Sequence, residues 1–193
     1  MEGSRFRIVV ALVLAISLSP PPPAGAAAAG ARIAELSITN SLDDLLVSLT
    51  VRDAFSPRME EAVFSGVPTS FSFFVVLTEI RTLWANRTVA DATLTHTIKY
   101  NNIRRNFSIQ RSWAEGEGEL FVSSFEEARR LMLEIEGFPV AALDRMKSGG
   151  RYELRAKAKL GKISLPFYLH HLLIMASLWA FETDWHRIEF VYE

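Results

Sequence analysis

The pattern of apolar and polar positions predicts a chain built mainly of β-strands. Between residues 45 and 51, leucine and valine alternate with a mostly polar set, and between residues 151 and 160 apolar side chains alternate with charged ones. An alternation with a period of two is typical of a strand that buries one face. Residues 69–82 carry apolar side chains on both faces, which favours a place in the middle of a sheet.

Further strands are predicted on either side of these segments. Residues 88–100 and 105–113 form the clearest hairpin, because two alternating runs flank a turn at Asn101-Asn102. A strand near residues 33–38 turns at Asp43-Asp44 into the strand at 45–51. An alternating run at residues 184–192 closes the chain.

Three segments predict helices, at residues 57–64, 124–136 and 166–180. Ser56 is an expected N-cap of the first helix, and Ser124 with Glu127 forms a capping box at the start of the second. Gly137 and Pro139 are expected to end that second helix. The third helix lies in an uncharged run that is short for a membrane span, so a buried or surface-docked helix is favoured.

These elements together predict a mainly β fold, an antiparallel β-sandwich of about seven or eight strands with two or three accessory α-helices at its ends or on one face. An α+β roll with a single curved sheet is the alternative. Five residues are expected in the core: Phe73, Val75, Leu131, Leu154 and Leu160.

The N-terminus has the order of a secretory signal peptide. Arg5 and Arg7 precede an uncharged apolar run at residues 8–18, and small residues follow a cluster of prolines. An uncleaved N-terminal anchor is the alternative. The chain is therefore expected to be exported and periplasmic, or anchored in the inner membrane. It divides into a signal peptide at 1–26, with the cut between 26 and 29, a linker of small residues at 27–32 and a single β-rich domain at 33–193.

Composition narrows the possible chemistry. The 193 residues include 21 basic and 22 acidic side chains, a formal net charge of -1, so no excess of positive charge indicates a nucleic-acid partner. Cysteine is absent, which excludes disulfides, thiolate metal sites and a cysteine nucleophile.

The order of features along the chain resembles the Gram-negative bacterial domain-of-unknown-function family 4390. The resemblance is carried by residues 56–68, 82–84, 96–100, 124–128, 152–160, 164–166 and 183–185, and it covers about residues 33–192. The resemblance implies a small exported or membrane-anchored protein, and it supplies no activity or catalytic residues. It also implies envelope signalling, since members of the family can be encoded near sensor histidine kinases.

No motif for catalysis, metal binding or cofactor binding is found. The four histidines, His96, His170, His171 and His186, form none of the usual zinc-binding spacings. The chain has no serine nucleophile elbow and no glycine-rich phosphate loop. We therefore expect no catalytic residue, no metal site and no cofactor.

A cluster of cations is the strongest candidate for a binding surface. Seven side chains are expected to form a basic face that contacts an anionic partner: Lys99, Arg105, Arg111, Arg151, Arg155, Lys157 and Lys159. The alternative is a solvated strand face with lysines guarding a sheet edge.

Three functions follow as hypotheses. The first is a non-enzymatic envelope module that binds a protein partner, such as a membrane sensor kinase, or a lipid surface. The second is a carrier or sensor of a hydrophobic ligand, which requires an apolar cavity of roughly 300 Å³ or more beside residues 165–181. The third is a periplasmic hydrolase, which requires a serine to converge with members of the set Asp91, His96, Asp184 and His186.

Overall fold

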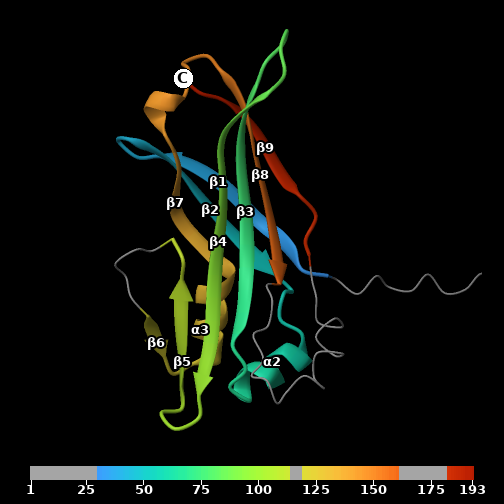
Figure 1. Cartoon of the computed structure of the whole chain (residues 1–193), viewed down its shortest axis with the longest axis vertical. Coiled ribbons are helices and arrows are strands. Elements are labelled where there is room, and N and C mark those ends of the chain that lie inside the picture. Colours follow the sequence, from blue (N-terminus) through green and yellow to red (C-terminus); the bar gives the residue numbers. More distant parts are fainter. Residues whose placement is uncertain (1–29, 114–118, 161–181) are drawn as a thin grey trace, which may run out of the picture.

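The structure is a computed structural model that describes residues 30–113, 119–160 and 182–193 (Figure 1). Within these ranges two antiparallel sheets are formed. The smaller sheet has the order β1 (Arg32–Asn40), β2 (Asp44–Arg52), β7 (Glu134–Ala142). The larger sheet has the order β6 (Leu120–Val122), β5 (Asn106–Arg111), β4 (Arg87–Asn101), β3 (Thr69–Ile80), β8 (Arg151–Leu160), β9 (His186–Val191). The prediction of a mainly β, antiparallel fold is confirmed.

The two sheets share one hydrophobic core in a sandwich-like arrangement. Of the five residues expected in the core, Phe73, Val75 and Leu154 are fully buried and Leu160 is almost so. Leu131 is half-buried and packs against the same cluster. The single curved sheet of the alternative prediction is not what the chain forms.

Strand β3 is central in the larger sheet, as its two apolar faces predicted. It pairs with β4 along one edge and with β8 along the other. Phe71, Phe73, Val75 and Leu77 on its inner face are fully buried, in agreement with the period-two pattern. The predicted hairpin of β4 and β5 is also present, with Asn101 opposite Asn106 at its end.

The predicted helix at residues 124–136 is wrong at its C-terminal end. Helix α3 covers Phe125–Leu133, and Glu134 begins strand β7 without an intervening turn. Gly137 and Pro139, which were expected to end the helix, lie inside this strand.

Strand β7 accommodates glycine and proline because it is an edge strand with two irregularities. Its register against β2 shifts once between Ala141 and Pro139 and again between Phe138 and Ile135, the interval that contains Gly137. Gly137 takes a φ of 64°, and its N–H donates to Ser48 Oγ at 3.0 Å. Proline lacks a ladder donor and is tolerated where a strand is at an edge or bulged. The two residues therefore mark a bulged edge strand here instead of a helix end.

Two helices are present in the described ranges, α2 (Pro57–Phe64) and α3, with a single 3₁₀ turn, η1, at Leu143–Arg145. Figure 1 places α2 and α3 together at one end of the sheets. The two helices meet through aromatic rings. The ring centres of Phe64 and Phe125 lie 5.1 Å apart, and both ring centres lie within 5.6 Å of that of Phe107 on β5. Neither helix in this part of the chain is long and apolar enough to cross a membrane. The predicted helix at 166–180 and the predicted signal peptide lie outside the described residues.

The two helix N-termini differ in a way that can be tested. Ser56 accepts a hydrogen bond from the N–H of Met59 at 3.3 Å, whereas the Ser124 side chain makes no cap hydrogen bond. Ser56→Ala is therefore expected to lower the free energy of unfolding by about 1 kcal/mol. Ser124→Ala is the matched control and is expected to cost less than about 0.5 kcal/mol. Urea denaturation followed by circular dichroism measures both, and equal losses would contradict the capping assignment.

Candidate functional site

The predicted basic residues do not form one uninterrupted face. Arg151, Arg155, Lys157 and Lys159 share the outer face of β8, and Lys99 is on the outer face of β4 with β3 between the two strands. Arg105 lies in the turn between β4 and β5, with a φ of 52°.

The cations of β8 are largely engaged by carboxylates. Lys157 and Lys159 contact Glu182 at 2.5 and 3.2 Å, and these contacts lower the pKa of that carboxyl. Arg155 pairs with Glu153 at 3.3 Å. Arg151 pairs with Glu189 on β9 at 3.2 Å.

Aromatic contacts occupy two of the same cations. Arg155 and Lys157 lie over the ring of Trp185, at 5.4 and 4.9 Å from its centre. Lys157 also lies 5.6 Å from the centre of Phe74. Because ion pairs and aromatic rings already engage these charges, the outer face of β8 fits a solvated strand face better than an open anion-binding site.

Arg111 belongs to a different environment. It lies opposite His96 in the β4–β5 register, toward the inner face of the sheet, and its guanidinium is 5.8 Å from the centre of the Trp113 ring. It therefore does not join the basic residues of the outer face.

His96 is fully buried and both ring nitrogens are used. Nε2 accepts a hydrogen bond from Trp113 Nε1 at 3.1 Å, and Nδ1 lies 3.2 Å from the carbonyl oxygen of Met132. Because the indole nitrogen can only donate, Nε2 must be unprotonated and Nδ1–H must donate. Burial lowers the pKa of His96 to about 4, and the charge of Arg111 contributes. The neutral residue therefore connects β4 to the segment that follows β5 and to the end of α3.

The residues named for a hydrolase do not converge in the described ranges. His96 faces the core, whereas Asp91 is exposed on the outer face of the same strand. His186 begins β9 and Asp184 lies just before it, and both β3 and β8 separate that strand from β4. No group of acidic and histidine side chains suited to a metal ion is found among the described residues.

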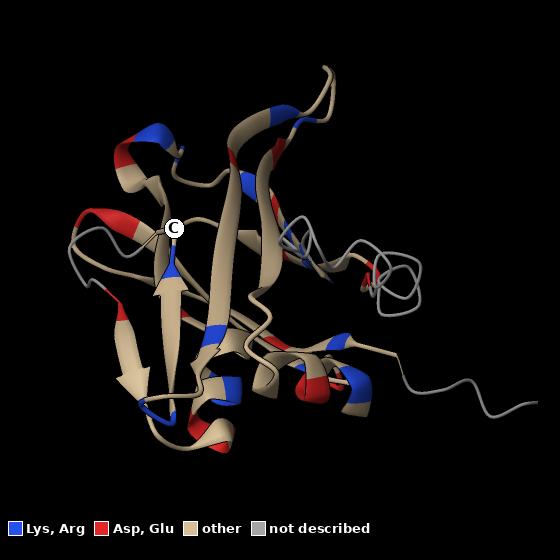
Figure 2. Cartoon of the chain, turned by 60° about the horizontal axis from the view of Figure 1, so that its bottom comes forward, with Lys and Arg blue, Asp and Glu red and all other residues tan. Residues whose placement is uncertain are grey.

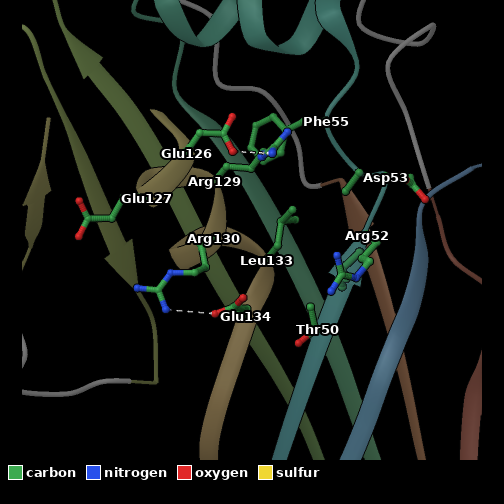
Figure 3. Close-up of a pocket in the computed structure, with 12 residues that line it drawn as sticks. Thr50, Arg52, Asp53, Phe55, Glu126, Glu127, Arg129, Arg130, Leu133 and Glu134 are labelled. Carbon is green, nitrogen blue, oxygen red and sulfur yellow. Dashed lines mark hydrogen bonds and ion pairs between the residues drawn. The ribbon is translucent and has the colours of Figure 1, made fainter. Parts of the chain in front are cut away.

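An open cleft lies between the end of β2 and helix α3 (Figure 3). Its volume is about 550 Å³, within the range of clefts that bind ligands or peptide segments. One wall runs from Thr50 to Phe55 and the other from Glu126 to Glu134. Phe55 and Leu133 are the larger apolar side chains in its lining, whereas most of the remaining lining is charged or polar.

Most charges in the cleft are paired within the chain. Arg129 contacts Glu126 at 2.6 Å and Arg130 contacts Glu134 at 3.6 Å, as the dashed lines in Figure 3 show. On the other wall, Asp53 pairs with Arg32 of β1.

Arg52 is the exception on the β2 wall. Its side chain is exposed and forms no ion pair or hydrogen bond with any residue of the described ranges. Figure 3 shows its guanidinium beside the cleft, across from Leu133 and Glu134. In the β1–β2 register Arg52 lies directly opposite Arg32, which is a cation already paired with Asp53 and offers Arg52 no partner. The fold therefore gains no evident stability from this cation.

A family model named Domain of unknown function (DUF4390) matches residues 28–189. The chain belongs to the DUF4390 family. The match confirms the resemblance to domain-of-unknown-function family 4390 that the order of sequence features indicated. No curated protein and no solved structure matches the chain.

In this DUF4390 chain, sequence reasoning missed the cleft because its walls are distant in sequence. The pattern that predicts a helix at residues 124–136 does not indicate which segment lies opposite its charged side chains. Arg52 ends an alternating strand, where a charged residue is ordinary. The cavity expected by the carrier hypothesis would lie beside residues 165–181, which are outside the described residues, so that hypothesis stays a prediction.

Proposed function

We propose that this DUF4390 chain is a non-enzymatic module of the cell envelope that binds a protein partner in the cleft between β2 and α3. The observation that carries the proposal is the exposed side chain of Arg52, which has no ion-pair partner among the described residues and lies in the cleft beside Phe55 and Leu133. Protein interfaces commonly join an apolar centre to a polar rim, and arginine is enriched in them. The N-terminal segment, with the order of a signal peptide, supports the envelope as the location.

The surroundings of Arg52 indicate the partner's chemistry. Its cross-strand neighbour Arg32 is already paired with Asp53, so Arg52 makes no stabilising ion pair across the strands, which disfavours a purely structural role. An acidic side chain on the partner would neutralise it while apolar groups cover the half-buried Phe55. The partner segment is therefore expected to carry a carboxylate next to apolar residues.

Charge reversal tests the proposal. The tagged full chain is isolated with native partners from detergent-solubilised envelope, as wild type, as Arg52→Glu and as Arg104→Glu. Arg104 is the matched control, an exposed arginine in the β4–β5 turn. Arg52→Glu is expected to reduce recovery of a stoichiometric protein about tenfold, whereas Arg104→Glu leaves it unchanged.

Two results of the same experiment would contradict the proposal. A partner recovered equally with Arg52→Glu would overturn the assignment of the cleft. Recovery of a stoichiometric lipid without any protein would replace the proposal with the carrier function. Thermal unfolding of both variants controls for folding, and each is expected to remain within about 0.5 kcal/mol of wild type.

A further inference from the structure

The loop between β3 and β4 carries two adjacent, highly exposed apolar residues. Leu83 is 88% exposed and Trp84 is 80% exposed. Tryptophan is strongly buried on average in folded proteins, so an exposed tryptophan next to an exposed leucine at a loop tip indicates a candidate interaction site. The loop projects beyond the sheets in both Figure 1 and Figure 2, at the end of the molecule away from α2 and α3.

The base of this loop is tied together by side chains. Asn86 Oδ1 accepts a hydrogen bond from the Arg81 N–H at 3.1 Å. Glu79 receives hydrogen bonds from Arg81 at 3.0 Å and from Arg87 at 2.7 Å. These hydrogen bonds therefore join the end of β3 to the start of β4. They stabilise the hairpin whose tip carries Leu83 and Trp84.

The same base holds an excess of positive charge. Lys147 Nζ is also 3.5 Å from Glu79, so three cations surround one carboxylate. The hydrogen bonds from Arg81 and Arg87 lower the pKa of Glu79 to about 2, so the carboxylate stays charged. Three cations and one anion leave a local surplus of two positive charges. Arg87 and Lys147 are 40% and 68% exposed and can reach a ligand outside the chain.

We propose that the 81–86 loop is a membrane-contact element that places Leu83 and Trp84 in the interface of a bilayer with anionic headgroups. Tryptophan favours the boundary between headgroups and acyl chains. Basic side chains next to such an anchor are attracted by anionic lipid phosphates. The two apolar side chains supply the inserted part, and the surplus cations at the base of the loop remain at headgroup level.

The shape of the loop favours a lipid surface over a protein. Two side chains at a convex tip cover roughly 400 Å² at most, below the ~800 Å² per partner of a standard protein interface. A bilayer interface accepts a small convex tip without a complementary pocket. The site is also separate from the β2–α3 cleft, which lies near the opposite end of the long axis in Figure 1, so both surfaces can be occupied together.

A local reporter tests the insertion in the full chain. The sequence has no cysteine, so Ala85→Cys provides a unique labelling position beside Leu83 and Trp84 without removing either. The probe is an environment-sensitive fluorophore, and the vesicles contain phosphatidylcholine with or without phosphatidylglycerol. Asn102→Cys is the control, because it lies beside Ile103, which is 95% exposed on the turn between β4 and β5.

The label at position 85 is expected to brighten, shift to the blue and be quenched by spin labels on the acyl chains when phosphatidylglycerol is present. The label at position 102 is expected to stay in water. Adding Trp84→Ala to the Ala85→Cys chain should raise the lipid concentration for half-maximal signal about tenfold, whereas adding Ile103→Ala should not. Because the signal comes from position 85 alone, it does not depend on how other apolar segments contact the vesicle.

Several results would overturn the inference. One is a label at position 85 that stays in water while the chain sediments with the vesicles. Equal signals at positions 85 and 102 would show adsorption without a specific tip. Equal signals on neutral and anionic vesicles would show that anionic headgroups have no role. An unchanged signal in the Trp84→Ala variant would show that the tryptophan does not anchor the loop.

Discussion

Phe73→Ala is expected to lower the free energy of unfolding by about 3–5 kcal/mol. Phe73 is fully buried on the inner face of β3, and its ring centre is 4.9 Å from that of His96. Its neighbours across the two strand pairs are Leu94 and Ala158. Since alanine cannot extend to fill the space and β3 is held on both sides, the cavity is expected to persist. Urea denaturation followed by circular dichroism measures the loss.

The residue that follows provides the matched control. Phe74 has the same side chain on the same strand, but it faces outward and is half-buried under Lys157. Phe74→Ala is expected to cost roughly 1 kcal/mol, through partial exposure and the lost contact with the lysine. Similar losses for the two substitutions would mean that the inner and outer faces of β3 are wrongly assigned.

Acidification is expected to destabilise the protein through His96. Folding lowers the pKa of this residue from 6.5 to about 4, so between these values the unfolded chain binds a proton that the folded chain excludes. The stabilisation is fully present above pH 6.5 and is lost as the pH falls toward 4. The total loss is about 3 kcal/mol. Denaturation at a series of pH values across this window measures it.

The contribution of His96 can be separated from that of the carboxylates. The lowered pKa of Glu79 lies near 2, so its stabilisation is present above its unfolded value of 4.5 and is lost at more acidic pH. In His96→Gln the dependence between pH 6.5 and 4 should shrink by about 3 kcal/mol, although the variant is less stable at neutral pH. An unchanged slope would show that the imidazole titrates normally and that the bond from Trp113 does not hold it neutral.

Several elements could be predicted from the sequence because the evidence for them is local. The alternation at Arg151–Leu160 places every second residue in the core, since successive side chains of a strand point to opposite faces. Asn101 marks the end of a hairpin because its side-chain oxygen accepts from the N–H groups of Ile103 and Arg104. Ser56 and Pro57 begin α2 for an equally local reason.

The same local reasoning was wrong at Gly137 and Pro139. Both residues are typical of helix ends, but they are also tolerated at the bulges of an edge strand. The deciding factor is β2, which lies about 90 residues earlier and offers a free edge to Glu134–Ala142. A pairing over that separation leaves no periodic trace in the sequence.

The sequence by itself determined the strand faces, the core and the family resemblance, because each depends on residue spacing along the chain. Only the tertiary structure decided how the charges are used. It paired Lys157 and Lys159 with Glu182 and gathered Arg81, Arg87 and Lys147 below an exposed tryptophan. It also placed Arg52 beside α3 without an ion-pair partner in the described part of the chain. A charge acts over a few ångströms in space, and the fold alone sets which charges lie that close.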